Sequence, residues 1–180
     1  MHGRKTPFEE SEASEIMRQL LVAILYLHTK EIMHRDIKAE NIMLSPKHKL
    51  TLVDFGLSEF TNSGNQDFVG TRYYVAPEMI RGPYTKQVDL WSAGVVAYLL
   101  LTKKVPFGGE TREETFENIL SRRVGFPKDC ELSGVAKDFV LRLLAKNPRS
   151  RMNSYQALQH PFIIEAKLKK QPLTLHFPPE

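Results

Sequence analysis

The feature that most constrains the fold is the stretch from Val88 to Leu101, where apolar residues fall on nearly every face of a helix around Trp91 and Tyr98. A helix that is apolar on all sides has to be buried on all sides. The chain of 180 residues, 42% of them hydrophobic, is long enough to build one core around such a helix. The sequence therefore predicts one domain of the α+β class, mostly helical, with this helix at its centre.

Two further elements are expected in the first third of the chain. The run Thr6-Pro7-Phe8-Glu9 has the form of a capping box with proline at the first helical position, and apolar residues then recur at helical spacing. This pattern predicts a long helix from about Pro7 to His28. The apolar runs 42–44 and 50–52 flank a polar turn and predict a short β-hairpin, with Asn41 before it and Asp54 after it.

The later segments differ in their regularity. Residues 58–71 are polar, contain glycine and show no period, so we expect a mobile loop there. Residues 135–144 repeat at intervals of three and four and predict a core-facing helix that ends at Asn147-Pro148. Residues 163–180 contain three prolines and are expected to form an extended tail.

The composition excludes several classes of function. A net charge of +4 with scattered basic residues gives little support to nucleic-acid binding. The single cysteine, Cys130, cannot form an internal disulfide and fits a reducing compartment. No secretory signal is recognisable, and the strongest apolar stretch, 94–101, is too short to span a bilayer. We therefore expect a soluble, cytoplasmic protein that binds neither nucleic acid nor membranes.

The chemistry is concentrated in residues 34–56. This stretch contains His34-Arg35-Asp36-Ile37-Lys38-Ala39-Glu40-Asn41 and, after a short interval, Asp54-Phe55-Gly56. An acid, a lysine, an amide and a second acid beside a glycine form a set suited to metal-assisted phosphoryl transfer, which depends on positioning and charge neutralisation.

In order and spacing, these residues resemble the catalytic loop and the magnesium loop of the protein kinase family. Three later runs strengthen the resemblance: G-T-R-Y-Y-V-A-P-E at 70–78, D-L-W-S-A-G at 89–94 and N-P-R-S-R at 147–151. The chain is most similar to the serine/threonine class, and within it to the calcium/calmodulin-dependent and calcium-dependent kinases. The resemblance implies that residues 1–162 are the C-terminal, large lobe of a kinase domain and that residues 163–180 are its tail.

The resemblance also implies a role for each site residue. Asp36 would accept or orient the proton of a serine or threonine hydroxyl on a protein substrate, Lys38 would face the transferred phosphate of ATP, and Thr71 would hydrogen-bond both residues. Asn41 and Asp54 would hold Mg²⁺. Met43, above Val96 and Leu100, would form the floor under adenine.

Other residues would act on structure and regulation. Arg151 is expected to form a buried ion pair with Glu78, and Asp89 belongs to the central helix motif. Arg35, which binds an activation-loop phosphate in the family, would instead meet the carboxylate of Asp67. A fixed carboxylate can partly replace phosphate as a partner of arginine.

The sequence contains no G-x-G-x-x-G segment and no lysine in a V-A-I-K strand, the parts of a kinase that cover and hold the ATP phosphates. Two hypotheses follow. The chain is the catalytic lobe of a serine/threonine kinase that works with an N-lobe or regulator supplied separately, or it is a non-catalytic kinase fragment that acts as a docking or regulatory module. The intact set of Asp36, Lys38, Asn41 and Asp54 favours the first hypothesis.

Overall fold

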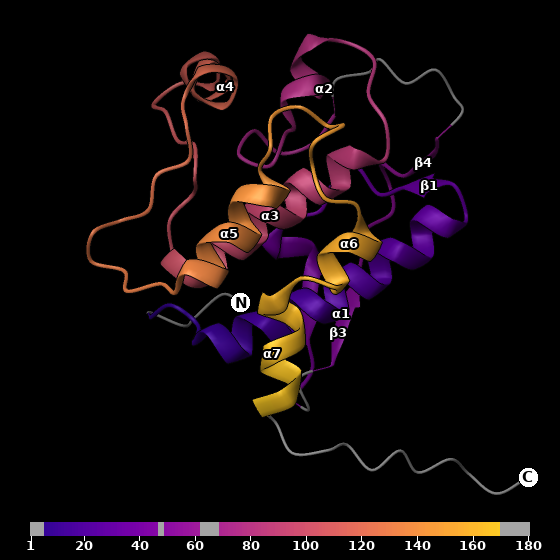
Figure 1. Ribbon diagram of the computed structural model, residues 1–180. Helices are drawn as coiled ribbons and strands as arrows, with labels where there is room; N and C mark the ends of the chain where they lie inside the picture. The colour runs from indigo at the N-terminus through magenta and orange to yellow at the C-terminus, as the bar shows by residue number, and fades with distance from the viewer. Residues whose placement is uncertain (1–5, 47–48, 62–68, 170–180) are drawn as a thin grey trace, which may run out of the picture.

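The computed structural model describes residues 6–46, 49–61 and 69–169, and helix α3 lies at the centre of the domain (Figure 1). Helix α3 spans Gln87–Thr102, and every residue in it except Gln87 and Leu99 is buried. The helix predicted to be buried on all sides is therefore confirmed. The described part of the chain is mostly helical with a few short antiparallel strands, as expected.

Helix α3 packs against α1 (Glu10–Thr29) and α5 (Gly134–Leu143). Helices α6 (Ser154–Leu158) and α7 (Pro161–Lys169) pack in turn against α1. Gly94 allows α5 to approach α3 closely, because a Cβ atom at this position would lie 2.9 Å from the Cβ atom of Leu143. Helix α5 ends at Leu143, four residues before Asn147. Two further helices, α2 (Pro77–Arg81) and α4 (Arg112–Ser121), contact each other, and Figure 1 shows α4 at the edge of the domain.

The start of α1 differs from the prediction. The helix begins at Glu10 rather than Pro7, and the backbone N–H of Glu9 donates to the Glu12 carboxylate at 3.1 Å. The cause is a tertiary contact, because the backbone N–H of Phe8 donates to the carbonyl of Leu100 at 2.9 Å, at the end of α3. This bond holds the chain against the central helix just before α1 begins.

Two small antiparallel sheets carry the segments that matter for function. Strand β2 (Ile42–Leu44) pairs with β3 (Leu50–Leu52), so the predicted hairpin is confirmed. Strand β1 (Ile32–Met33) pairs with β4 (Glu59–Phe60), with Met33 opposite Glu59. Strand β4 lies inside the segment expected to be a loop, half of which (62–68) falls outside the described residues.

Residues 163–169 correct the expectation of an extended tail. They belong to helix α7, which begins at Pro161, a residue whose fixed φ suits the first position of a helix. Phe162 is buried, its ring centroid lies 4.8 Å from that of Phe139, and its carbonyl accepts a hydrogen bond from Ser14 Oγ at 2.8 Å. The burial of this apolar segment against α1 and α5 outweighs the absence of a clear helical signal in the sequence.

Among the described residues, no helix combines the length and apolar character that crossing a membrane requires.

Candidate active site

The loop that follows β1 is fixed by the carboxylate of Asp89 on α3. Asp89 is fully buried, and it accepts hydrogen bonds from the backbone N–H groups of His34 at 3.0 Å and Arg35 at 2.9 Å. Nε2 of His28, on α1, lies 2.9 Å from the same carboxylate. Arg35 has a φ of 66°, a conformation that a non-glycine residue adopts only when its surroundings impose it. The two hydrogen bonds to Asp89 supply that constraint.

The side chains of Asp36, Lys38, Asn41 and Thr71 form one hydrogen-bonded cluster. Lys38 Nζ lies 2.6 Å from Asp36 Oδ2 and donates to Thr71 Oγ1 at 3.3 Å. Thr71 Oγ1 in turn lies 3.5 Å from Asp36 Oδ1. The structure thus brings Thr71 to a loop that is more than thirty residues away in the sequence.

Asn41 completes this cluster from the turn η1 (Ala39–Asn41). Its side-chain nitrogen donates to the Asp36 carbonyl at 2.9 Å and to Asp36 Oδ2 at 3.0 Å. These bonds fix the rotamer of Asp36. Because the nitrogen of the amide faces Asp36, the oxygen is the atom of Asn41 that is left to bind a cation.

Asp54 follows β3 beside Asn41. The backbone N–H of Val53 donates to the Asn41 carbonyl at 3.0 Å, so the two ends of the hairpin meet at this point. Asp54 has a φ of 65°, its side chain is exposed, and its Oδ1 accepts from the backbone N–H of Gly56 at 3.3 Å. Gly56 is suited to the close turn, because a Cβ atom there would lie 3.2 Å from Asp54 Oδ1.

This geometry agrees with the comparison with known proteins. Residues 1–163 match the family description "Protein kinase domain". The chain belongs to the protein kinase family.

Several relatives of the chain are plant proteins. The chain is 36% identical over 94% of its length to calcium-dependent protein kinase 29 of Arabidopsis thaliana. It is 38% identical over 94% of its length to calcium-dependent protein kinase 19 of Oryza sativa subsp. japonica. It is 41% identical over 89% of its length to CDPK-related kinase 8 of Arabidopsis thaliana. The chain spans 33%, 33% and 28% of these three proteins, respectively, or about a third of their length.

The ion pair expected from the kinase resemblance between Arg151 and Glu78 is present. Arg151 Nη1 lies 2.6 Å from Glu78 Oε1, and Arg151 Nη2 lies 3.0 Å from Glu78 Oε2. The Arg151 side chain is fully buried and also donates to the carbonyls of Gln87 and Ala145. Its guanidinium carbon lies 5.1 Å from the centroid of the Trp91 ring. The pair therefore joins α2 to the central helix of the kinase fold.

Arg35 has a partner that the sequence did not indicate. Its guanidinium forms an ion pair with the carboxylate of Glu59 on β4, and it donates to the carbonyl of Leu57 at 2.6 Å and to the hydroxyl of Tyr84 at 3.1 Å. Asp67, which we expected to be the partner, lies outside the described residues. Glu59 reaches Arg35 because β4 pairs with β1. The sequence could have indicated this partner only if the two strands had been recognised, and two-residue strands are too short to be recognised from a pattern.

His34 lies fully buried among the acidic residues of the kinase loops. Burial lowers the pKa of His34, and the neighbouring carboxylates of Asp89, Asp36 and Asp54 oppose this shift without cancelling it. The ring centroid of His34 lies 4.8 Å from that of Phe55. A neutral imidazole therefore supports the loop through packing and adds no positive charge to the site.

Met43 lies on the outer face of the β2–β3 hairpin, with 59% of its surface exposed. We expected Met43, Val96 and Leu100 together to form the floor under adenine, and this expectation is only partly met. Val96 and Leu100 are buried in the core of the domain, because α3 is covered on all sides. Met43 is thus the exposed member of the three.

The donor set of the site can be tested against magnesium. Among the described residues, no group of three or more histidine, cysteine, aspartate or glutamate side chains could hold a metal ion by itself. Asn41 and Asp54 present oxygen ligands, and magnesium is usually held by one or two protein carboxylates together with substrate phosphates and water. The residues present therefore fit this ion.

Proposed function

We propose that this chain is the large, C-terminal lobe of a serine/threonine protein kinase, which transfers the γ-phosphate of ATP to hydroxyl groups of protein substrates. The hydrogen-bonded cluster of Asp36, Lys38, Asn41 and Thr71 carries the proposal. Phosphoryl transfer depends mainly on positioning and electrostatic stabilisation, and both require side chains that are held before the substrate arrives.

Asp36 is the residue that we assign to the substrate hydroxyl. In the reaction, the hydroxyl oxygen forms a bond to the γ-phosphorus, the bond from phosphorus to the bridging oxygen of ADP breaks, and the hydroxyl proton passes to the Asp36 carboxylate. Asn41 and Thr71 hold this carboxylate in place from two sides. Lys38, at 2.6 Å from Asp36, places a positive charge where the negative charge of the transferred group develops.

Asn41 and Asp54 are the residues that we assign to Mg²⁺, and Met43 is assigned to the adenine of ATP. Magnesium, when bound, neutralises charge on the ATP phosphates. The 180-residue sequence contains no G-x-G-x-x-G segment, so the proposal assigns the covering of these phosphates to a separate segment or partner.

The assignment to serine and threonine acceptors rests on Lys38 and Thr71, which resemble the serine/threonine class. The similarity of the chain to calcium-dependent protein kinases supports this assignment. The alternative of a non-catalytic docking module does not explain why all four polar side chains remain in one cluster.

The test joins the chain to an amino-terminal lobe that carries a G-x-G-x-x-G segment and a V-A-I-K lysine, and measures the transfer of labelled phosphate to a serine peptide. We expect turnover in the joined protein, and we expect Asp36→Asn to lower kcat by about 10² to 10⁴-fold with little change in the affinity for magnesium-ATP. Asp54→Asn should instead weaken the binding of magnesium-ATP.

The matched control is Asp129→Asn. Asp129 is 74% exposed, and its only ion pair among the described residues is a long contact of 3.5 Å with the exposed Lys104 Nζ. Such a pair contributes little, so Asp129→Asn should leave kcat and the affinity for magnesium-ATP unchanged. Equal effects of Asp36→Asn and Asp129→Asn would contradict the assignment of Asp36 and favour the non-catalytic module.

A further inference from the structure

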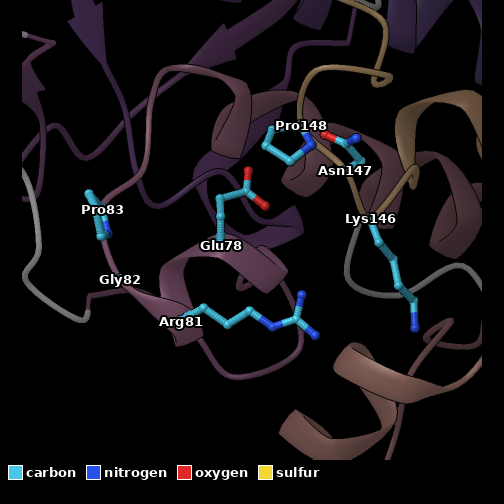
Figure 2. A pocket seen from close by; sticks show the side chains of 7 residues that line it. All are labelled: Glu78, Arg81, Gly82, Pro83, Lys146, Asn147 and Pro148. Carbon is cyan, nitrogen blue, oxygen red and sulfur yellow. The ribbon is translucent and has the colours of Figure 1, made fainter.

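A pocket of about 510 Å³ lies between helix α2 and the segment that follows α5, away from the Asp36 cluster. It is lined on one side by Glu78, Arg81 and Pro83, and on the other by Lys146 and Pro148. Figure 2 shows the side chains of Arg81 and Lys146 extending toward the same space, whereas the carboxylate of Glu78 is turned toward Pro148. None of these residues has a role in the proposed phosphoryl transfer.

The only carboxylate among the described residues that line the pocket is already engaged. Glu78 accepts two hydrogen bonds from Arg151, at 2.6 and 3.0 Å, in a geometry that uses both of its oxygens. A paired arrangement of this kind is the strongest form of arginine–carboxylate interaction. Glu78 is therefore bound to Arg151 and does not neutralise the other positive charges of the pocket.

Arg81 and Lys146 remain without a carboxylate. Within the described part of the chain, neither side chain forms an ion pair or a hydrogen bond, and Arg81 is exposed. Lys146 Nζ lies 5.8 Å from the ring centroid of Phe107, which stacks on Trp91 at a centroid distance of 5.6 Å. The ring of Phe107 thus attracts the Lys146 ammonium group at the edge of the pocket.

The direction of the pKa shift of Lys146 agrees with the absence of a carboxylate partner for this residue among the described residues. Partial burial lowers the pKa of Lys146, and the positive charge of Arg81 lowers it further. Two like charges that share a cavity raise the free energy of the empty pocket, and an anion placed between them would remove this repulsion. A guanidinium fork beside an ammonium group is also the combination that recognises phosphate and carboxylate oxygens.

We propose that this pocket binds the phosphate or carboxylate group of an acidic protein segment, held between Arg81 and Lys146. The pocket is much larger than one such group, and the rings of Pro83 and Pro148 offer apolar walls to the residues beside it. A peptide can pack its neighbouring side chains against these two proline rings, whereas a free anion cannot. The site is independent of phosphoryl transfer, so it can be tested by binding alone, without ATP.

The experiment measures fluorescence anisotropy of labelled peptides against the 180-residue chain. The probes are a short phosphoserine peptide, the same peptide with glutamate at the central position, and the same peptide with unmodified serine. We expect the phosphoserine and glutamate peptides to bind at low salt and the serine peptide to bind at least tenfold more weakly. We also expect the affinity to fall as salt is added, because the contact is ionic.

The double variant Arg81→Gln with Lys146→Gln should weaken the binding of both acidic peptides at least tenfold. The matched control is Lys30→Gln with Arg123→Gln, which removes two exposed charges that do not line the pocket and should leave binding unchanged. Thermal unfolding of both proteins provides the check on folding. Arg81→Lys keeps the charge but loses the fork, so its affinity should lie between those of the wild type and the double variant.

A second measurement addresses Lys146 directly. NMR titration of its side chain should show a pKa that rises when the phosphoserine peptide is bound, because the negative charge of the phosphate stabilises the ammonium form and offsets the effects of burial and of Arg81. Inorganic phosphate serves as the competitor. Equal binding by the double variant and the wild type, or competition by inorganic phosphate at the same concentration as the peptide, would overturn the proposal of a peptide site.

Discussion

The guanidinium of Arg35, next to Asp36, forms an ion pair with the carboxylate of Glu59 on strand β4. The Arg35 side chain is 9% exposed and that of Glu59 is 32% exposed, so the pair is only partly screened by solvent. The resemblance to the protein kinase family implies that an arginine at this position binds an activation-loop phosphate. In this structure Arg35 is paired instead with the carboxylate of Glu59, which lies on the strand that pairs with β1.

The first prediction concerns this pair. Glu59→Gln should leave the Arg35 cation without its charged partner and lower the free energy of unfolding by about 1 to 2 kcal/mol. Hydrogen exchange of the backbone at residues 57–60 should become faster. Thermal unfolding and hydrogen exchange measure both effects.

The control for Glu59 is Glu31→Gln, which alters an exposed pair with Lys86 and should change the melting temperature little. Asp67→Asn provides a second comparison. A larger loss of stability in Asp67→Asn than in Glu59→Gln would mean that Asp67, as the sequence suggested, is the main partner of Arg35.

The second prediction concerns the buried pair of Glu78 and Arg151. Glu78→Gln should lower the free energy of unfolding by about 3 to 5 kcal/mol, because it leaves a fully buried guanidinium without a countercharge. Denaturant unfolding measures this change. Arg142→Gln, which breaks an exposed pair with Asp138, should cost less than about 1 kcal/mol. Similar losses in the two variants would show that burial does not strengthen the Glu78 pair.

The third prediction distinguishes the effect of the Thr71 hydroxyl group from the effect of the size of its side chain. In the joined protein described above, Thr71→Val should lower kcat about tenfold, because the hydroxyl that contacts Lys38 and Asp36 is lost at nearly constant volume. Thr71→Ser keeps the hydroxyl and should retain most of the activity. Steady-state kinetics would contradict this role if the serine and valine variants were equally impaired.

The fourth prediction concerns pH and His34. Burial lowers the pKa of this residue in the folded state below its unfolded value of about 6.5, so the unfolded chain binds a proton first as the pH falls. The contribution of His34 to stability is therefore complete above pH 6.5 and is lost as the pH falls toward the folded pKa. His34→Phe keeps a ring against Phe55 and should flatten the pH dependence of unfolding below pH 6.5. An unchanged slope in this variant would assign the dependence to other groups.

The fifth prediction concerns ATP. The 180-residue chain alone should bind magnesium-ATP with a dissociation constant above about 1 mM, since its sequence has no G-x-G-x-x-G segment to cover the phosphates. Phosphate transfer should be very slow, because nothing then fixes the ATP phosphates. Such positioning can supply about 7 to 11 kcal/mol of barrier reduction, and most of it would be lost. Isothermal titration and a radiolabel assay test this. Sub-millimolar binding with steady turnover would show that the chain holds ATP without such a segment.

The sequence by itself determined the elements whose signals are local. The α3 helix was predictable because nearly every residue from Val88 to Leu101 is apolar, and the β2–β3 hairpin because two apolar runs flank a polar turn. Asp36, Lys38 and Asn41 lie within six residues of one another, so their spacing alone indicated a common site. The places of Thr71 and of the Arg151–Glu78 pair came from the family resemblance, because nothing local connects partners 33 and 73 residues apart.

Only the tertiary structure decided the features that depend on contacts between distant segments. The backbone bond from Phe8 to Leu100 moved the start of α1, and burial of Phe162 and Ile163 turned residues 163–169 of the expected tail into helix α7. The pairing of β1 with β4 brought Glu59 to Arg35. In each case the free energy comes from burial or hydrogen bonding between segments far apart in the sequence. A periodic pattern records which residues face inward, but it does not record which partner they meet.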